Sequence, residues 1–292
     1  MHGVIAAVPT PLDAGGKFMS GLFLSHCQWA LDNGCDGLNI LGSTGEANSF
    51  DSTTRISIMR AAAKNLDTSR LMVGTGTPSL AETVALTVAA DDLLYPAALV
   101  LPPYYYKPLS GEGLFRWYEQ LHAALGDRPI AVYFYNFPQM TGLEIPIPVI
   151  QRLHDRWPER FAGIKDSSGD LGYCRKLAAM MPKLKVFPSS EVSLAEAHKS
   201  GFAGCISATT NQTSVLSAKL WAARKLPDQS LAARISEIRD AIAGPALIPS
   251  VKYLVACRTN HSEWENLMPP FMSLSSEQKA ILDPTIKLLS RG

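Results

Sequence analysis

Eight short apolar segments, each followed by a stretch with helical periodicity, constrain the fold of this chain more than any other feature. The candidate strands are rich in β-branched and aliphatic residues: Gly3–Val8, Gly37–Leu41, Arg70–Gly74, Ala97–Leu101, Ile130–Tyr135, Ala162–Lys165, Val186–Ser189 and Cys205–Ala208. The stretches that follow them carry apolar residues every three to four positions: Leu22–Asn33, Thr53–Asn65, Leu80–Asp91, Gly113–Leu125, Ile147–Arg156, Leu171–Met180, Leu194–Ser200 and Ser214–Ala223. Eight strand–helix repeats predict an α/β protein, a closed (β/α)8 TIM barrel.

An open, doubly wound sheet shows the same alternation and is the alternative architecture. Its usual phosphate-binding fingerprint is missing, because the best candidate, Val73–Ser79, lacks the third glycine and carries Pro78 near its end. The strand signal stops near Ala223, and the later segments have only helical periodicity. We therefore expect a barrel in residues 1–223, with residues 224–292 forming a C-terminal helical extension that packs on it.

Charge and composition narrow the class of partner. The net charge is +1, from 27 basic and 26 acidic residues that are spread along the chain without a basic run or a basic–aromatic stripe. This pattern argues against nucleic acid and against a membrane surface, and no apolar run is long enough to span a bilayer. The five scattered cysteines predict neither a disulfide framework nor a zinc site. We expect a cytoplasmic protein that acts on a small molecule.

Lys165 is the first candidate for chemistry, because the active site of a (β/α)8 barrel lies at the C-terminal ends of its strands. Lys165 ends an apolar strand, so its side chain is expected to point into the barrel mouth. A poorly solvated amine favours the uncharged form, which can attack a ketone and give an iminium. The alternative is that Lys165 extends to solvent or pairs with Asp166.

Two further strand ends support this hypothesis. Tyr135 ends the preceding strand, so its phenol is expected beside Lys165, where it can move protons; alternatively it only fills the top of the barrel. Ser43 and Thr44 lie between two glycines after the second strand. Their hydroxyls and backbone N–H groups predict a cradle for a carboxylate, although a plain turn is the alternative, and Glu46 is expected to be structural.

Four motifs occur in a characteristic order: GSTGE at Gly42–Glu46, PPYYYKP at Pro102–Pro108, YNFP at Tyr135–Pro138 and GIKDSSGD at Gly163–Asp170. With them the chain resembles the dihydrodipicolinate synthase / N-acetylneuraminate lyase family of pyruvate-dependent aldolases over essentially its whole length. The resemblance implies a Schiff base between Lys165 and pyruvate, Tyr135 as the acid/base phenol, and a pyruvate carboxylate held by Ser43 and Thr44.

The resemblance also implies features beyond these four residues. Tyr105 is similar to a tyrosine that reaches across a subunit interface into a neighbour's site, and Ile206 lies where a backbone carbonyl commonly faces the site. Family members are commonly homotetramers built as a dimer of dimers. No metal or organic cofactor is expected.

The motifs do not point to a single substrate. Members that make dihydrodipicolinate carry an arginine two residues after the YNxP proline, where this chain has Met140. The remaining motifs are similar to aldolases that release pyruvate and an aldehyde from 2-keto-3-deoxy sugar acids or from 4-hydroxy-2-oxo acids. Glu191 falls where some sugar-acid members bind substrate hydroxyls, or else is an exposed glutamate at a helix start. Dihydrodipicolinate synthesis, a dehydratase that uses the same imine, and a non-catalytic keto-acid-binding barrel are the alternatives.

Overall fold

The computed structural model describes residues 1–244 and 246–289. Its eight strands are parallel and follow each other round a barrel: β1 Gly3–Ala7, β2 Gly37–Ile40, β3 Leu71–Gly74, β4 Ala97–Val100, β5 Ala131–Asn136, β6 Phe161–Asp166, β7 Lys185–Pro188 and β8 Gly204–Ser207. β1 pairs with β2 on one side and with β8 on the other, and Ala203 N, just before β8, donates to Val186 O in β7 at 2.9 Å. The nearly closed barrel confirms the predicted fold, and the doubly wound alternative is wrong.

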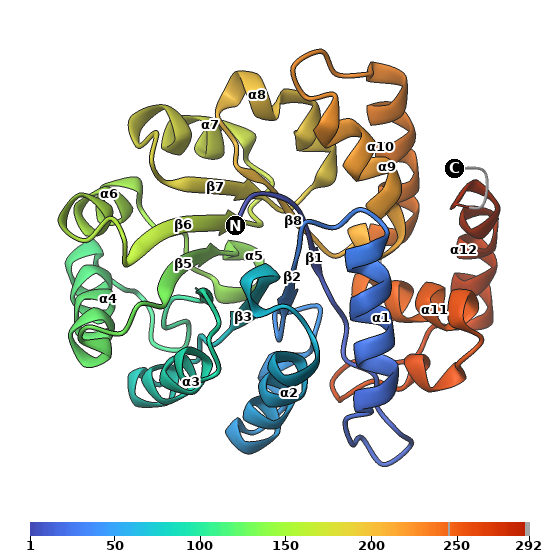
Figure 1. Ribbon diagram of the computed structural model, residues 1–292, viewed down its shortest axis with the longest axis horizontal. Helices are drawn as coiled ribbons and strands as arrows, with labels where there is room; N and C mark the ends of the chain where they lie inside the picture. The colour runs from blue at the N-terminus through green and yellow to red at the C-terminus, as the bar shows by residue number, and fades with distance from the viewer. Residues whose placement is uncertain (245, 290–292) are drawn as a thin grey trace.

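Helices surround the strands and form the outer ring of the barrel, while the one-turn helix α5 lies near its centre beside β5 (Figure 1). Their bounds are α1 Ser20–Asp32, α2 Ser52–Asn65, α3 Leu80–Asp92, α4 Gly111–Leu125, α5 Pro138–Thr141, α6 Ile147–Arg156, α7 Leu171–Met180, α8 Ala197–Ser200 and α9 Thr210–Ala222. Short 3-10 turns lie between them: η1 Ala47–Ser49, η2 Thr68–Arg70 and η3 Glu191–Glu196. Arg70, predicted to start a strand, belongs to η2, where the Asp67 side chain accepts from the backbone N–H of Ser69.

Side chains alternate between two apolar layers along each strand, as the two-residue period of a strand requires. Ile5, Leu99 and Ile206 belong to the cluster inside the barrel, whereas Val4 and Val100 pack outward in the cluster under the helices. Gly74 allows a close approach between neighbouring units, since a Cβ there would lie 2.0 Å from the carbonyl oxygen of Leu41. The loop after β2 can therefore pack directly on the end of β3.

The C-terminal helices α10 Gln229–Ala243, α11 Leu247–Thr259 and α12 Ser276–Leu289, with the 3-10 turn η4 Ser262–Glu265, lie together at one side of the barrel (Figure 1). They confirm the predicted helical extension, while its boundary at residues 223 and 224 stays a prediction. Pro245 and residues 290–292, which fall within that prediction, lie outside the described residues. Among the described residues no single helix is long and apolar enough to cross a membrane; α10 and α11 meet that criterion only when joined as a sharply bent pair.

A buried ion pair ties this extension to the barrel. Lys252 Nζ in α11 lies 2.6 Å from Glu46 Oε1 and 2.9 Å from the carbonyl oxygen of Thr10, and neither charged side chain is exposed. The second carboxylate oxygen of Glu46 accepts from the backbone N–H of Met268 at 2.7 Å. Glu46 is therefore structural, as the sequence predicts, and it holds the loop that carries Ser43 and Thr44 against α11.

Candidate active site

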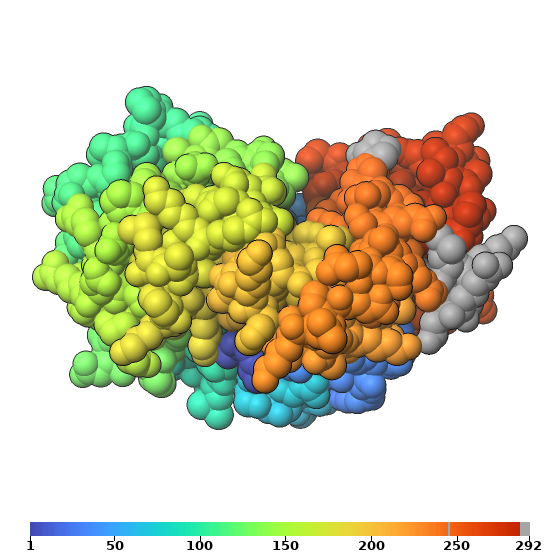
Figure 2. All heavy atoms as spheres, turned by 90° about the horizontal axis from the view of Figure 1, so that it is seen from above, coloured from blue at the N-terminus to red at the C-terminus, as the bar shows by residue number. Residues whose placement is uncertain are grey.

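A cavity of about 520 Å³ lies at the C-terminal ends of the strands. The barrel forms one wall, and the other comes from the start of α11 and from residues 270–273 of the C-terminal extension. Figure 2 shows the molecule hollowed between the green part of the barrel and the red end of the chain. The walls combine hydroxyl groups and two cationic side chains with apolar residues such as Leu247, Ile248 and Phe271.

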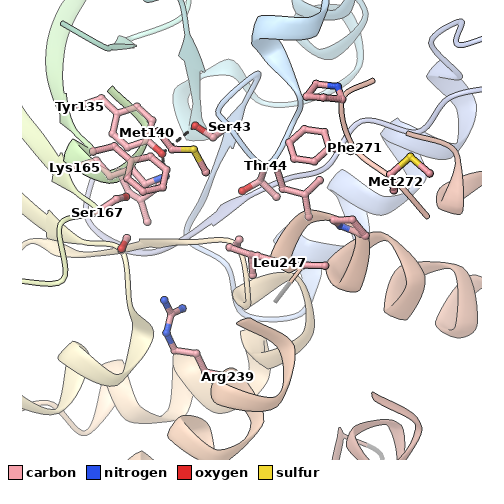
Figure 3. Close-up of a pocket in the computed structure, with 18 of the residues that line it drawn as sticks. Ser43, Thr44, Tyr135, Met140, Lys165, Ser167, Arg239, Leu247, Phe271 and Met272 are labelled. Carbon is pink, nitrogen blue, oxygen red and sulfur yellow. Dashed lines mark hydrogen bonds between the residues drawn. The ribbon is translucent and has the colours of Figure 1, made fainter. Parts of the chain in front are cut away.

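Lys165, Tyr135 and Ser43 form a chain of polar groups in this cavity (Figure 3). Tyr135 and Lys165 are direct partners in the pairing of β5 with β6. Lys165 Nζ donates to Tyr135 Oη at 3.3 Å and lies 4.5 Å from the centre of the tyrosine ring. Tyr135 Oη is in turn 3.3 Å from Ser43 Oγ. The phenol therefore contacts both the amine and the hydroxyl, as its position at a neighbouring strand end predicts.

Asp166 does not neutralise the lysine. Strand alternation turns its side chain away from that of Lys165, and its carboxylate accepts hydrogen bonds from Asn136 Nδ2 and Ser168 Oγ, each at 2.7 Å. Burial raises the pKa of Asp166, and these hydrogen bonds oppose that rise. Lys165 is only 4% exposed. Both alternatives for this lysine, extension to solvent and pairing with Asp166, are therefore wrong.

The loop after β2 presents its polar groups to the cavity. It bends at residues with left-handed backbone, Leu41 (φ 52°) and Glu46 (φ 57°), and closes through a hydrogen bond from Gly45 N to Gly42 O at 3.0 Å. Within residues 1–244 and 246–289, the backbone N–H groups of Ser43 and Thr44 have no protein acceptor. Both side chains line the cavity. The loop that borders the cavity thus carries two N–H groups without a protein acceptor and two hydroxyls, the combination expected of a carboxylate cradle.

Comparison with known proteins places this geometry in a family. The model of the dihydrodipicolinate synthetase family matches residues 1–289. The chain belongs to the dihydrodipicolinate synthetase family. It is accordingly an enzyme, a class I lyase of the aldolase type that acts through a Schiff base.

One relative and two solved structures match this member of the synthetase family over nearly its whole length. A DapA-like lyase of Chloroflexus aurantiacus is 30% identical over the whole chain and 98% of its own length. The crystal structure of dihydrodipicolinate synthase from Agrobacterium tumefaciens has a TM-score of 0.89 at 25% identity, with 99% of both chains covered. A prophage protein of the same family from E. coli, solved in complex with pyruvate, has a TM-score of 0.89 at 24% identity, also covers 99% of both chains, and shares the fold.

Tyr105 and Ile206 differ in their relation to the cavity. Tyr105 is 72% exposed, its ring packs edge-on against Tyr106 with centroids 5.2 Å apart, and it does not line the cavity of its own chain. This position suits the predicted reach into a neighbour, which stays a prediction. Ile206, by contrast, is among the residues that line the cavity, and the role of its backbone carbonyl also stays a prediction.

Glu191 lies behind the cavity wall. It is fully buried, so the alternative of an exposed glutamate is wrong. Its carboxylate accepts from the hydroxyls of Ser207 (2.6 Å), Thr209 (2.6 Å) and Thr213 (2.7 Å), and it pairs with Arg239 Nη1 at 3.1 Å. These four protein donors occupy both oxygens, and Glu191 is not among the cavity residues. The geometry therefore does not support a direct contact between Glu191 and substrate hydroxyls.

Arg239 is a charged site residue that the sequence patterns do not reveal. It projects from α10 toward the cavity, as Figure 3 shows, and it is one of the two cations that line the described cavity. Nothing in the sequence distinguishes it from the other arginines of the chain, because its role depends on how α10 packs against α9 and η3. No group of three His, Cys, Asp or Glu side chains suited to a metal ion occurs in the described residues.

Proposed function

We propose that the enzyme reversibly cleaves a 2-keto-3-deoxy sugar acid or a 4-hydroxy-2-oxo acid to pyruvate and an aldehyde through a Schiff base on Lys165. One observation carries this proposal: a buried lysine amine 3.3 Å from a tyrosine hydroxyl, inside a cavity that also holds an anion cradle. The amine supplies the covalent nucleophile, and the phenol supplies proton transfer within hydrogen-bond reach.

The cleavage reaction uses these groups in order. The Lys165 amine attacks the C2 ketone, and proton transfers through Tyr135 allow water to leave, which forms the C=N⁺ bond. Tyr135 then accepts the proton of the C4 hydroxyl while the C3–C4 bond breaks, and that bond's electron pair moves into the iminium to give an enamine. The aldehyde leaves, the enamine takes up a proton at C3, and water releases pyruvate from Lys165.

The residue at position 140 favours cleavage over dihydrodipicolinate synthesis. Met140, which occupies the position of the aspartate-semialdehyde arginine, lines the cavity and is 66% exposed. A thioether cannot form the two parallel hydrogen bonds that a guanidinium gives to a carboxylate. A dehydratase would use the same imine to expel water instead of breaking a C–C bond, so detection of pyruvate among the products separates these two outcomes.

Assembly into a homotetramer is part of the proposal. The exposed aromatic pair Tyr105 and Tyr106 gives the chain a surface suited to an interface, where aromatic residues are enriched. An active monomer in sedimentation experiments would contradict a role for Tyr105 in a neighbour's site.

Borohydride trapping tests the covalent step. The protein is reduced in the presence of pyruvate and analysed by intact and peptide mass spectrometry. We expect a pyruvate-derived adduct on the peptide that contains Lys165, and its loss in Lys165→Ala. Lys185→Ala is the matched control, because Lys185 is an exposed lysine at the opposite end of the neighbouring strand β7. Folded wild-type protein that gives no adduct would refute the proposed function.

A further inference from the structure

The cavity carries an excess of positive charge, and the pyruvate chemistry uses only part of it. Among the described residues that line it there are two cations, Lys165 and Arg239, and no aspartate or glutamate. Lys165 is consumed by the Schiff base, and the cradle at Ser43 and Thr44 is assigned to the pyruvate carboxylate. Arg239 is thus left facing the part of the cavity that holds the other half of the substrate.

The guanidinium of Arg239 is held by one of its nitrogen atoms. Nη1 donates to Thr209 Oγ1 at 2.8 Å and to Ser207 Oγ at 3.0 Å, and lies 3.1 Å from Glu191 Oε2. In the described part of the chain, Nη2 and Nε have no hydrogen-bond partner, and the side chain is 20% exposed. Glu191, being fully buried and saturated by hydroxyls, orients the arginine from behind and leaves these donors available.

The surroundings strengthen any interaction made at this arginine. Leu247, Ile248 and Phe271 form an apolar wall of the same cavity, and charge-assisted hydrogen bonds are stronger where water is displaced. A guanidinium with two available donors suits carboxylate or phosphate oxygens better than neutral hydroxyls.

We propose that Arg239 binds a second anionic group, a carboxylate or a phosphate, at the aldehyde end of the substrate. This inference rests on the proposed function and narrows it to 4-hydroxy-2-oxo dicarboxylic acids or phosphorylated 2-keto-3-deoxy acids. The aldehyde partner of pyruvate is then itself an anion.

The test runs in the condensation direction with pyruvate and two matched pairs of acceptors. Glyoxylate is compared with glycolaldehyde, and glyceraldehyde 3-phosphate with glyceraldehyde, by kcat/KM. We expect wild-type enzyme to prefer the anionic member of at least one pair by about tenfold or more, and the preferred pair identifies carboxylate or phosphate. Arg239→Met should lower kcat/KM for that anion by about 10- to 100-fold and change the neutral acceptor by less than about threefold.

Two controls keep the result specific. Arg60→Met removes an exposed arginine on α2 that does not line the cavity, and it should leave the preference unchanged. If Arg239→Met does not fold, the combined variant Arg239→Met/Glu191→Gln removes both charges together and is measured in the same way.

Equal use of anionic and neutral acceptors by wild type, or an equal loss of kcat/KM for both acceptors in the variant, would overturn the inference. Because borohydride trapping of pyruvate on Lys165 does not depend on the acceptor, a retained adduct in that case leaves the proposed function standing.

Discussion

At the scale of single residues, the hydroxyl of Tyr135 is the group on which the proposed chemistry depends. It is 3.3 Å from both Lys165 Nζ and Ser43 Oγ, which is long for hydrogen bonds between such groups. Catalytic hydrogen bonds are often long in a site without substrate and shorten in the reacting complex. The position of Tyr135 between the amine and the cradle lets it serve both carbinolamine formation and C–C cleavage.

Replacing Tyr135 with phenylalanine removes this proton path and keeps the ring against the lysine. We expect kcat to fall by about 10²- to 10⁴-fold, the usual contribution of a positioned acid or base, with a much smaller change in the KM for pyruvate. Steady-state kinetics measures both constants. Tyr133→Phe is the control, because Tyr133 lies two residues earlier on β5 and also faces the barrel interior. An unchanged kcat in Tyr135→Phe would assign the proton transfers to another group.

At the scale of elements, the strands were predictable and several polar helix ends were not. All eight strands lie within one residue of their predicted bounds, because a buried parallel strand is a short apolar run with a clear end. α9 begins at Thr210 instead of Ser214, since its first turn is polar although buried: Asn211 donates to the carbonyls of Ala7 and Ala208. An apolar periodicity cannot reveal a turn of this kind.

A similar distinction applies to the candidate site residues. Lys165, Tyr135, Ser43, Thr44 and Ile206 all line the cavity, because residues at the ends of neighbouring barrel strands must share one rim. Arg239, which was not predicted, lies on α10, and Glu191, whose predicted contact with substrate hydroxyls the geometry does not support, lies on a 3-10 turn. In both places side-chain direction depends on packing between elements distant in sequence. Sequence periodicity carries no information about that packing.

The ion pair between Lys252 and Glu46 gives a prediction at this scale. Burial lowers the pKa of Lys252, and the charge of Glu46 opposes that shift. Lys252→Met leaves the Glu46 carboxylate buried without its cation, so the free energy of unfolding should fall by about 3–5 kcal/mol in urea titrations. The double variant Lys252→Met/Glu46→Gln removes both charges and should lose less than the sum of its two single variants.

A surface pair provides the comparison for this experiment. Lys279 in α12 forms an ion pair with Glu265, and both side chains are about one-third exposed. Lys279→Met should cost at most about 1 kcal/mol, because solvent already screens that pair. Equal losses in Lys252→Met and Lys279→Met would show that the buried pair does not hold the cradle loop to α11.

At the scale of the whole molecule, a buried histidine links the first helix to the end of the barrel and to the extension. His26 in α1 has Nδ1 2.8 Å from Arg258 Nη2 and Nε2 2.8 Å from Asn211 Oδ1. An arginine can only donate, so Nδ1 must accept and Nε2 must carry the proton that goes to Asn211. The network thus requires a neutral imidazole, and its hydrogen bonds connect α1, α9 and α11.

This requirement makes stability depend on pH. Burial, and secondarily the charge of Arg258, lowers the pKa of His26 from 6.5 to about 3 in the folded protein, while its hydrogen bond to Asn211 opposes the shift. Between these values the unfolded chain binds a proton that the folded protein does not, so the free energy of unfolding falls as the pH falls below 6.5. The loss from this one group should approach about 1.4 kcal/mol per pH unit.

Urea titrations from pH 7 to pH 5 should therefore give a steeper decline in the free energy of unfolding for wild type than for His26→Gln, whose amide can replace both hydrogen bonds without a charge. His198→Gln, at an exposed position on α8, serves as the control. Parallel curves for wild type and His26→Gln would mean that the folded protein accommodates a charged imidazole at this junction, and that the three helices are not held together by its neutral form.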